Sequence, residues 1–266
     1  MRSLLNECLG ELAGTFMVVF LGCGAVAVSL LFNGLPHITA IAAVWGIAVI
    51  TAIYLFRSVC GAHFNPAVSI AMVIAGRFEK RKLVGYFMAQ LAGAMVAAGM
   101  LYLLLKGSLT TYENTHDIVR GTPGSAASAR MFGEFYAPNP VLLAMLAECA
   151  GTFLLTTGIF IITHAQPGKK SRLTYAPVAI GILLALLICV FASVTQAGFN
   201  PARDFGPRCI AFLCGWQAAA FPDQTGGFFW VYILAPFMGA AMAAVLYNYY
   251  RRWSLGTALK MKYENG

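Results

Sequence analysis

The sequence predicts an all-α membrane protein with six transmembrane helices and two re-entrant half-helices arranged as an inverted repeat. Three observations predict this fold class: an apolar composition, six long apolar runs, and segments of the first half that recur in the second. Of the 266 residues, 59% are hydrophobic and 11% are charged, whereas soluble domains have about 45–50% apolar and about 25% charged residues. This composition excludes a soluble enzyme, a disordered chain and a nucleic-acid-binding domain, although the formal net charge is +8.

Six apolar runs have the length that a bilayer requires, because a helix needs about 20 residues to cross roughly 30 Å of hydrocarbon. The first run could also be a signal peptide, since Ala25-Val26-Ala27 resembles a cleavage site. Glu11 within it, and a counterpart of this run later in the chain, favour a retained span. The six predicted spans are 9–32, 39–56, 83–105, 141–163, 175–194 and 228–247.

Most of the 18 Lys and Arg residues fall on one side of these spans, around the connections 57–82 and 164–174, after the last span, and at Arg2. Cytoplasmic connections of membrane proteins collect such residues. We therefore predict a multi-pass protein of the cell membrane with both termini in the cytoplasm, an extracellular connection over 106–140 and a cytoplasmic tail over 253–266. No chemistry is recognisable in the 106–140 connection. The positive charge indicates topology, so no nucleic-acid partner is expected.

The seven cysteines lie mostly within apolar runs. Their number is odd, and their spacing fits neither a disulfide framework nor a metal site, which is typical of small buried side chains. We expect no metal and no cofactor.

The chain also repeats itself in order. The segment ELAGT at 11–15 recurs as ECAGT at 148–152, NPA at 65–67 recurs at 200–202, and AQLAGA at 89–94 recurs loosely as APFMGA at 235–240. Each half holds three spans, so the second half begins on the opposite face of the membrane. The chain is then one transmembrane domain, 1–266, with inverted repeats over approximately 1–107 and 139–252. In such repeats the functional site lies near the midplane.

The two NPA triplets predict helices that are too short to span. Asn is favoured at a helix cap and Pro at the first helical position. The helices expected after them, 67–75 and 202–212, cover roughly 15 Å, about half of the hydrocarbon thickness. Each must therefore turn back, and the two N-termini meet near the centre. Non-helical backbone such as that at 60–64 and 195–199 is tolerated at this depth only where it lines a cavity or is buried in protein. Its carbonyls would form a row of acceptors, with the apolar spans as the opposite wall.

The motifs GAHFNPAV at 61–68 and GFNPAR at 198–203 resemble those of the major intrinsic protein (aquaporin) family, and the resemblance covers essentially the whole chain. It implies a six-helix bundle with two half-helices in the lipid bilayer, one pore in each subunit and a homotetramer. The pore motifs implied by the resemblance are Asn65, Pro66, Ala67, Asn200, Pro201 and Ala202.

Charged residues within the spans need a reason, because each costs several kcal/mol unless paired. The resemblance suggests that Glu11 and Glu148 each accept hydrogen bonds from a re-entrant loop. Arg203 resembles the arginine of the family's constriction, which presents hydrogen-bond donors to permeating hydroxyls. Asp204 is expected to be structural rather than pore-lining. His63 could either line the pore or pack the loop.

The family's narrowest point can be located by counting from the triplets, which gives Trp45, Ile188, Ala197 and Arg203. Water-selective members have a smaller aromatic residue and a histidine there, and both are missing in this sequence. The set resembles that of plant nodulin-like intrinsic proteins and partly that of bacterial glycerol facilitators. Trp45 and Ile188 offer an apolar wall for the CH groups of a polyol, while Arg203 and the loop carbonyls serve its hydroxyls.

We therefore predict a passive channel for glycerol and other small uncharged solutes, with urea as a further candidate, that conducts some water and excludes protons and ions. Arg208 and Pro236 match residues of glycerol-conducting members, whereas Phe237 departs from them, and so does Ala197 where bacterial facilitators have Phe. A water-dominant channel of the same fold remains the alternative. A coupled transporter or a membrane enzyme would need more titratable groups gathered within the spans.

Overall fold

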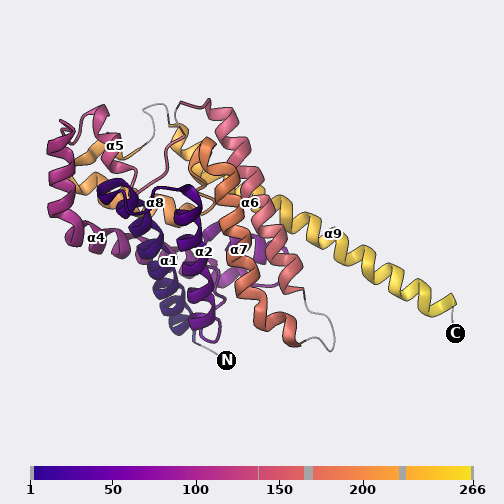
Figure 1. Cartoon of the computed structure of the whole chain (residues 1–266). Coiled ribbons are helices and arrows are strands. Elements are labelled where there is room, and N and C mark those ends of the chain that lie inside the picture. The colour runs from indigo at the N-terminus through magenta and orange to yellow at the C-terminus, as the bar shows by residue number, and fades with distance from the viewer. Residues whose placement is uncertain (1–2, 137, 165–169, 222–225, 265–266) are drawn as a thin grey trace.

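The computed structural model describes residues 3–136, 138–164, 170–221 and 226–264, and within them it forms an all-helical bundle (Figure 1). Six helices contain stretches long and apolar enough to cross a membrane. This confirms the six predicted spans. The long helices are α1 (Leu4–Phe32), α2 (Ile38–Phe56), α4 (Leu83–Thr115), α6 (Val141–Thr163), α7 (Lys170–Thr195) and α9 (Ala235–Glu264), the last preceded by a wide turn, η5 (Phe229–Leu234).

Two predicted connections are more helical than the sequence indicated. Helix α4 continues to Thr115 instead of ending near residue 105, because Leu109 and Glu113 pack inward at its end and are almost fully buried. The rest of the 106–140 connection contains the short helix α5 (Ala126–Ala129) and a 3₁₀ turn, η2 (Pro123–Ser125). Helix α9 runs through most of the expected 253–266 tail and projects from the bundle (Figure 1).

The two short helices begin where the triplets predict. Helix α3 (Pro66–Ile74) and helix α8 (Pro201–Ala211) each start with the proline of the triplet. The side chain of Asn65 caps α3 by accepting from the amide of Ala67 at 2.9 Å, and Asn200 caps α8 by accepting from Ala202 at 3.1 Å. Each cap satisfies a backbone N–H that the helix itself cannot.

Glycines allow the long helices to approach closely at matched places in the two halves. A Cβ on Gly93 of α4 would collide with the carbonyl oxygen of Leu12 in α1, and one on Gly239 of α9 would collide with that of Cys149 in α6. Small residues at helix crossings are typical of membrane bundles, where van der Waals packing replaces the hydrophobic effect.

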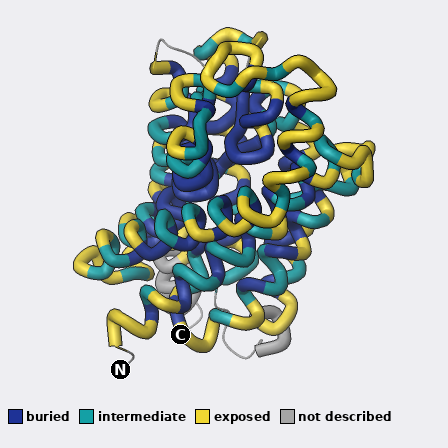
Figure 2. The backbone as a smooth tube through the Cα atoms, turned by 90° about the vertical axis from the view of Figure 1, so that its left-hand side faces the viewer, coloured by how far each residue is buried: buried dark blue, intermediate teal, exposed yellow. Residues whose placement is uncertain are grey.

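The surface of the bundle is largely apolar, and the buried residues follow its interior (Figure 2). Side chains such as Val84, Leu103 and Leu213 are more than two-thirds exposed. A soluble protein rarely exposes so many large apolar groups, so this surface suits contact with lipid. Lys169, one of the basic residues used to predict topology, lies outside the described residues.

Candidate functional site

A cavity of about 440 Å³ lies between the two halves of the chain. Both asparagines of the triplets line it, together with the extended segments that precede them. Helices α2 and α7 provide an apolar wall that includes Val49, Ile180 and Leu184. None of the described residues that line the cavity is acidic. The cavity is therefore lined by the two loops and their asparagines and by hydrocarbon side chains of α2 and α7.

The two asparagines bond across the interface between the halves. The side-chain amide of Asn65 donates to the carbonyl of Phe199 at 2.8 Å, and that of Asn200 donates to the carbonyl of Phe64 at 2.7 Å. Since each side-chain amide has two hydrogens, one hydrogen of each remains for a solute. The sequence did not predict these crossed bonds. They bring the N-termini of α3 and α8, each with roughly half a positive charge, to one place.

Two buried carboxylates hold the extended segments. Glu11 accepts from the amides of His63 at 2.9 Å and Phe64 at 2.8 Å. Glu148 accepts from those of Gly198 at 2.9 Å and Phe199 at 2.7 Å. Both carboxylates are fully buried. Backbone amides therefore supply the hydrogen bonds that a buried charge requires.

The segments need this support because their backbone is strained. The φ angle is positive at Ala62 and Phe64 in the first segment, and at Gln196, Ala197 and Phe199 in the second. Each such residue costs about 1–3 kcal/mol and persists only when its surroundings enforce it. The carboxylates thus stabilise a backbone that would otherwise relax.

His63 lines the cavity, and its side chain also contacts residues that support its own loop. Its Nδ1 lies 3.1 Å from the hydroxyl oxygen of Ser69, and its ring lies 4.9 Å from that of Phe78 and 5.3 Å from that of Tyr86, between centroids. The two alternatives that the sequence left open therefore coexist in the structure.

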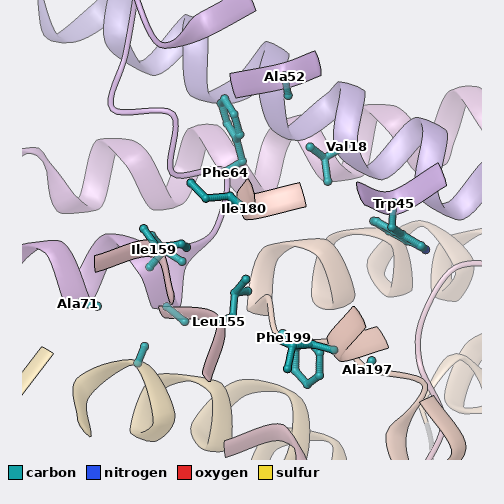
Figure 3. Close-up of a cluster of buried hydrophobic side chains, with 14 of the residues drawn as sticks. Val18, Trp45, Ala52, Phe64, Ala71, Leu155, Ile159, Ile180, Ala197 and Phe199 are labelled. Carbon is teal, nitrogen blue, oxygen red and sulfur yellow. The ribbon is translucent and has the colours of Figure 1, made fainter. Parts of the chain in front are cut away.

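The four residues counted from the triplets come together. Trp45, Ile188, Ala197 and Arg203 all line the same cavity and are nearly buried. The guanidinium carbon of Arg203 lies 4.3 Å from the centre of the Trp45 ring. Figure 3 shows Trp45 and Ala197 among the buried side chains of this region. An aromatic face, two apolar side chains and one cation thus surround the same space.

The 106–140 connection, in whose sequence no chemistry is recognisable, contributes a charged group to the site. Glu134 of this connection forms a buried ion pair with Arg203. The other terminal nitrogen of the guanidinium, Nη1, has no hydrogen-bond partner among the described residues. The carboxylate is one of ten in the chain, but it belongs to no repeat or motif, so only the three-dimensional structure places it beside Arg203.

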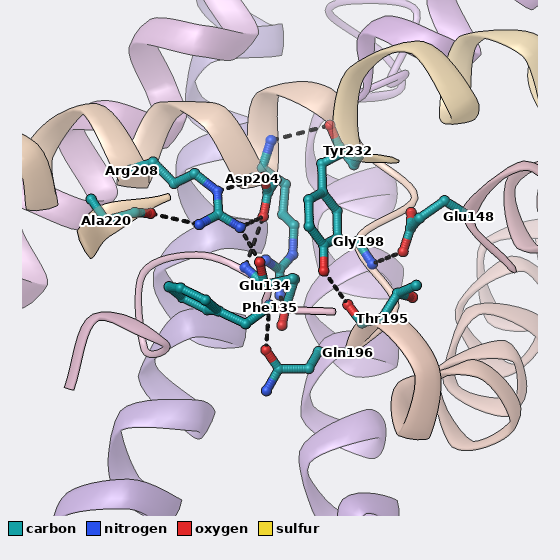
Figure 4. A network of polar contacts seen from close by, with 12 residues as sticks. Glu134, Phe135, Glu148, Thr195, Gln196, Gly198, Asp204, Arg208, Ala220 and Tyr232 are labelled. Carbon is teal, nitrogen blue, oxygen red and sulfur yellow. Dashed lines mark hydrogen bonds and ion pairs between the residues drawn. The ribbon is translucent and has the colours of Figure 1, made fainter. Parts of the chain in front are cut away.

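A network of buried charges surrounds this pair (Figure 4). Asp204 accepts from the amide of Glu134 at 2.8 Å and pairs with Arg208 at 2.8 Å. Arg208 also donates to the carbonyls of Glu134 and Ala220. Asp204 is fully buried and does not line the cavity, so it shapes the loop behind the pore wall.

The chain is similar to one family of proteins and to several uptake facilitators. The family described as "Major intrinsic protein" matches residues 1–247. The chain is 39% identical over 249 residues to the glycerol uptake facilitator protein of Pseudomonas aeruginosa, covering 91% of this chain and 87% of the relative. It is 36% identical over 253 residues to that of Escherichia coli K12, covering 92% and 88%. It is also 36% identical over 252 residues to the propanediol uptake facilitator PduF of Citrobacter freundii, covering 93% and 92%.

A solved structure is similar as well. The X-ray structure of the aquaglyceroporin from Plasmodium falciparum superposes with a TM-score of 0.80 at 27% identity. The match covers 92% of this chain and 96% of that one. The agreement therefore extends over the whole bundle and is not confined to the triplets.

Proposed function

Because this chain belongs to the major intrinsic protein family, we propose that it is a passive channel for glycerol and other small uncharged solutes. It is a membrane protein, and its family consists of channels and not of enzymes. The names of its relatives, facilitators of glycerol and propanediol uptake, support a small polyol as the solute. Water passes too, and protons and ions are excluded.

The observation that carries this proposal is the chemistry of the space beside Arg203. Its Nη1 is buried and has no hydrogen-bond partner in the described part of the chain, and Trp45 and Ile188 line the same cavity. A polyol has hydroxyls along one edge and CH groups along the other. Its hydroxyls can accept from Arg203 and donate to loop carbonyls while its CH groups contact the apolar wall.

Exclusion of protons and ions follows from the crossed asparagines. A water molecule or hydroxyl that accepts from the remaining amide hydrogens of Asn65 and Asn200 cannot also accept from the neighbouring water molecules in the pore. The chain of hydrogen bonds that would carry a proton is then interrupted. The two positive helix ends add an electrostatic barrier to cations.

We propose the cell membrane as the location, both termini in the cytoplasm, and inverted repeats over 1–107 and 139–252. The placement of basic residues supports this orientation, and the recurring segments support the repeat. The exposed apolar side chains can pack against lipid or against another subunit. We propose a homotetramer with one pore in each subunit. Cross-linking in native membranes and accessibility of the termini to protease test these statements.

The function is tested with purified protein in liposomes by stopped-flow light scattering. We expect glycerol and water to pass, urea to pass more slowly, and a six-carbon polyol to be excluded. A proton gradient across the same vesicles should decay no faster than in empty vesicles. Water flux without glycerol flux would instead support the water-dominant alternative.

A further inference from the structure

A chain of hydrogen bonds connects a cavity-lining residue, Gly61, to the ion pair between Glu7 and Lys82. The amide of Gly61, a cavity-lining residue, donates to the phenolic oxygen of Tyr86 at 2.9 Å. That hydroxyl donates to Glu7 at 2.9 Å, and the other oxygen of Glu7 accepts from Lys82 at 2.9 Å. Lys82 also pairs with the half-exposed Glu79 at 3.1 Å. We call Gly61, Tyr86, Glu7 and Lys82 the tether.

The tether acts where the first loop receives least support from Glu11. Glu11 holds the amides of His63 and Phe64, close to the meeting point of the half-helices. Gly61 comes earlier in the loop than these two residues, and its amide bonds to Tyr86 instead. This amide belongs to the peptide between Cys60 and Gly61, and the next residue, Ala62, has a positive φ. Fixing this peptide therefore fixes the point from which the strained part of the loop starts.

Tyr86 is suited to this role by its surroundings. Its side chain is fully buried, and its ring packs 4.5 Å from that of Phe78 and 5.3 Å from that of His63, between centroids. Both of these neighbours line the cavity. The ring is therefore held on two sides, and its hydroxyl can fix the position of the Gly61 amide.

Among the described residues of the second half, no such connection is present. At the matched position, Tyr232 donates to the carbonyl of Thr195 at 2.9 Å, at the end of α7, and not to a carboxylate. The residue that corresponds to Glu7, four positions before Glu148, is Ala144. The tether is thus a feature of one end of the pore and is not required by the shared fold.

We infer that Tyr86 and Glu7 are positioning residues that hold the Gly61 end of the lumen open, and that Lys82 couples this end to charge at the membrane surface. This inference rests on the proposed channel function. Loss of the tether lowers the permeability to every solute, because it narrows a part of the pore that all of them share. It leaves the glycerol-to-water ratio unchanged, because the residues around Arg203 are untouched.

The test compares Tyr86→Phe with wild-type protein in liposomes. The substitution keeps the ring and removes both hydrogen bonds, so we expect glycerol and water permeability to fall together by about fivefold, the change that one net hydrogen bond produces in an equilibrium. The matched control is Tyr102→Phe, in the same helix but away from the cavity, where the hydroxyl accepts from Arg120. That variant should conduct as the wild type does.

A second readout reports the loop itself. Cys60 precedes Gly61 and is 3% exposed, so in a background with the other cysteines replaced its reaction with methyl methanethiosulfonate measures local opening. We expect Tyr86→Phe to react about fivefold faster. Unchanged permeability and unchanged labelling in folded Tyr86→Phe would overturn the inference. A large change of the glycerol-to-water ratio would do the same, because the effect would then lie at the filter.

Glu7 provides the variants that remain informative if Tyr86→Phe does not fold. Glu7→Gln keeps an oxygen that accepts from Tyr86, whereas Glu7→Ala removes it. Conduction that is retained in Glu7→Gln and reduced in Glu7→Ala supports the tether, and equal conduction in the two contradicts it. If wild-type protein does not pass glycerol, the proposed function fails, while Cys60 labelling still tests the tether.

Discussion

The two pore loops have nearly the same backbone but carry different side chains at matched positions. Three residues after the asparagine the first half has Val68 and the second has Arg203, and the next position holds Ser69 or Asp204. Around Ser69 the partners are neutral, with Gln90 donating at 3.1 Å. Around Asp204 they are charged. At this position one half therefore has neutral hydrogen bonds, and the other has a group of buried charges beside Arg203.

What the halves share is the frame itself. Glu11 and Glu148 each accept from two loop amides, and these amides lie at matched positions in the two halves. A Cβ on Gly14 would collide with the ring of Phe64, and one on Gly151 would collide with that of Phe199. The comparison teaches that matched residues set the geometry of the pore, whereas unmatched residues set its chemistry.

The largest expected difference between the halves is in the stability lost on substitution of Ser69 or of its counterpart Asp204. Asp204→Ala leaves Arg208 buried without its carboxylate, which costs about 3–5 kcal/mol. Ser69→Ala loses a neutral hydrogen-bonding group and costs about 1 kcal/mol. Thermal unfolding in detergent should therefore show a much larger loss for Asp204→Ala. Equal losses would contradict the contrast between a charged and a neutral loop.

The shared frame predicts equal effects in the two halves. Gly14→Ala and Gly151→Ala each push a methyl group into a phenylalanine ring, and overpacking of this kind costs about 1–3 kcal/mol. Gly99→Ala is the control, because nothing lies within 4 Å of the added Cβ and alanine favours the helix by up to about 1 kcal/mol. Melting temperatures should fall similarly for the first two and not for the third. If the melting temperature falls for only one of the two variants, the glycine–phenylalanine contacts of the two halves are not equivalent.

The filter should respond in selectivity more than in stability. Trp45→Phe combined with Ile188→His removes part of the apolar wall beside Arg203 and adds a hydrogen-bonding side chain that favours water over the CH groups of a polyol. We expect the glycerol-to-water permeability ratio to fall by about tenfold, equivalent to about 1.4 kcal/mol. Stopped-flow measurements on liposomes check this. An unchanged ratio would show that these two residues do not form the constriction.

The smallest effect is expected at Glu134. Glu134→Gln keeps an oxygen acceptor for Arg203 but replaces a charge-assisted hydrogen bond with a neutral one, a difference of about 1 kcal/mol. Glycerol permeability should change by less than about fivefold, and Glu134→Ala should have the larger effect because Arg203 then loses its partner. If the two variants conduct alike, the carboxylate does not fix Arg203.

Much of this site could be predicted because its signals are local and repeated. Asn65 and Asn200 stand beside prolines that start helices, and counting from them identified Trp45 and Ile188, which line the same cavity as Arg203. Glu134 could not be found this way, because its position depends on how the 106–140 connection packs. The part of that connection after α4 contacts α8 through Asp204 and the end of α4 through Glu113, and no spacing in the sequence encodes those contacts.

The crossed asparagine bonds also bear on how the molecule is made. Asn65 donates to a carbonyl of the second half and Asn200 to one of the first. The ribosome synthesises the first half before the second. Until the second half is inserted, the loop before Asn65 therefore lacks the hydrogen bonds that the second half provides. We therefore expect the lumen to be the last region to assume its final structure during biosynthesis, after all six spans have been inserted and the halves have met.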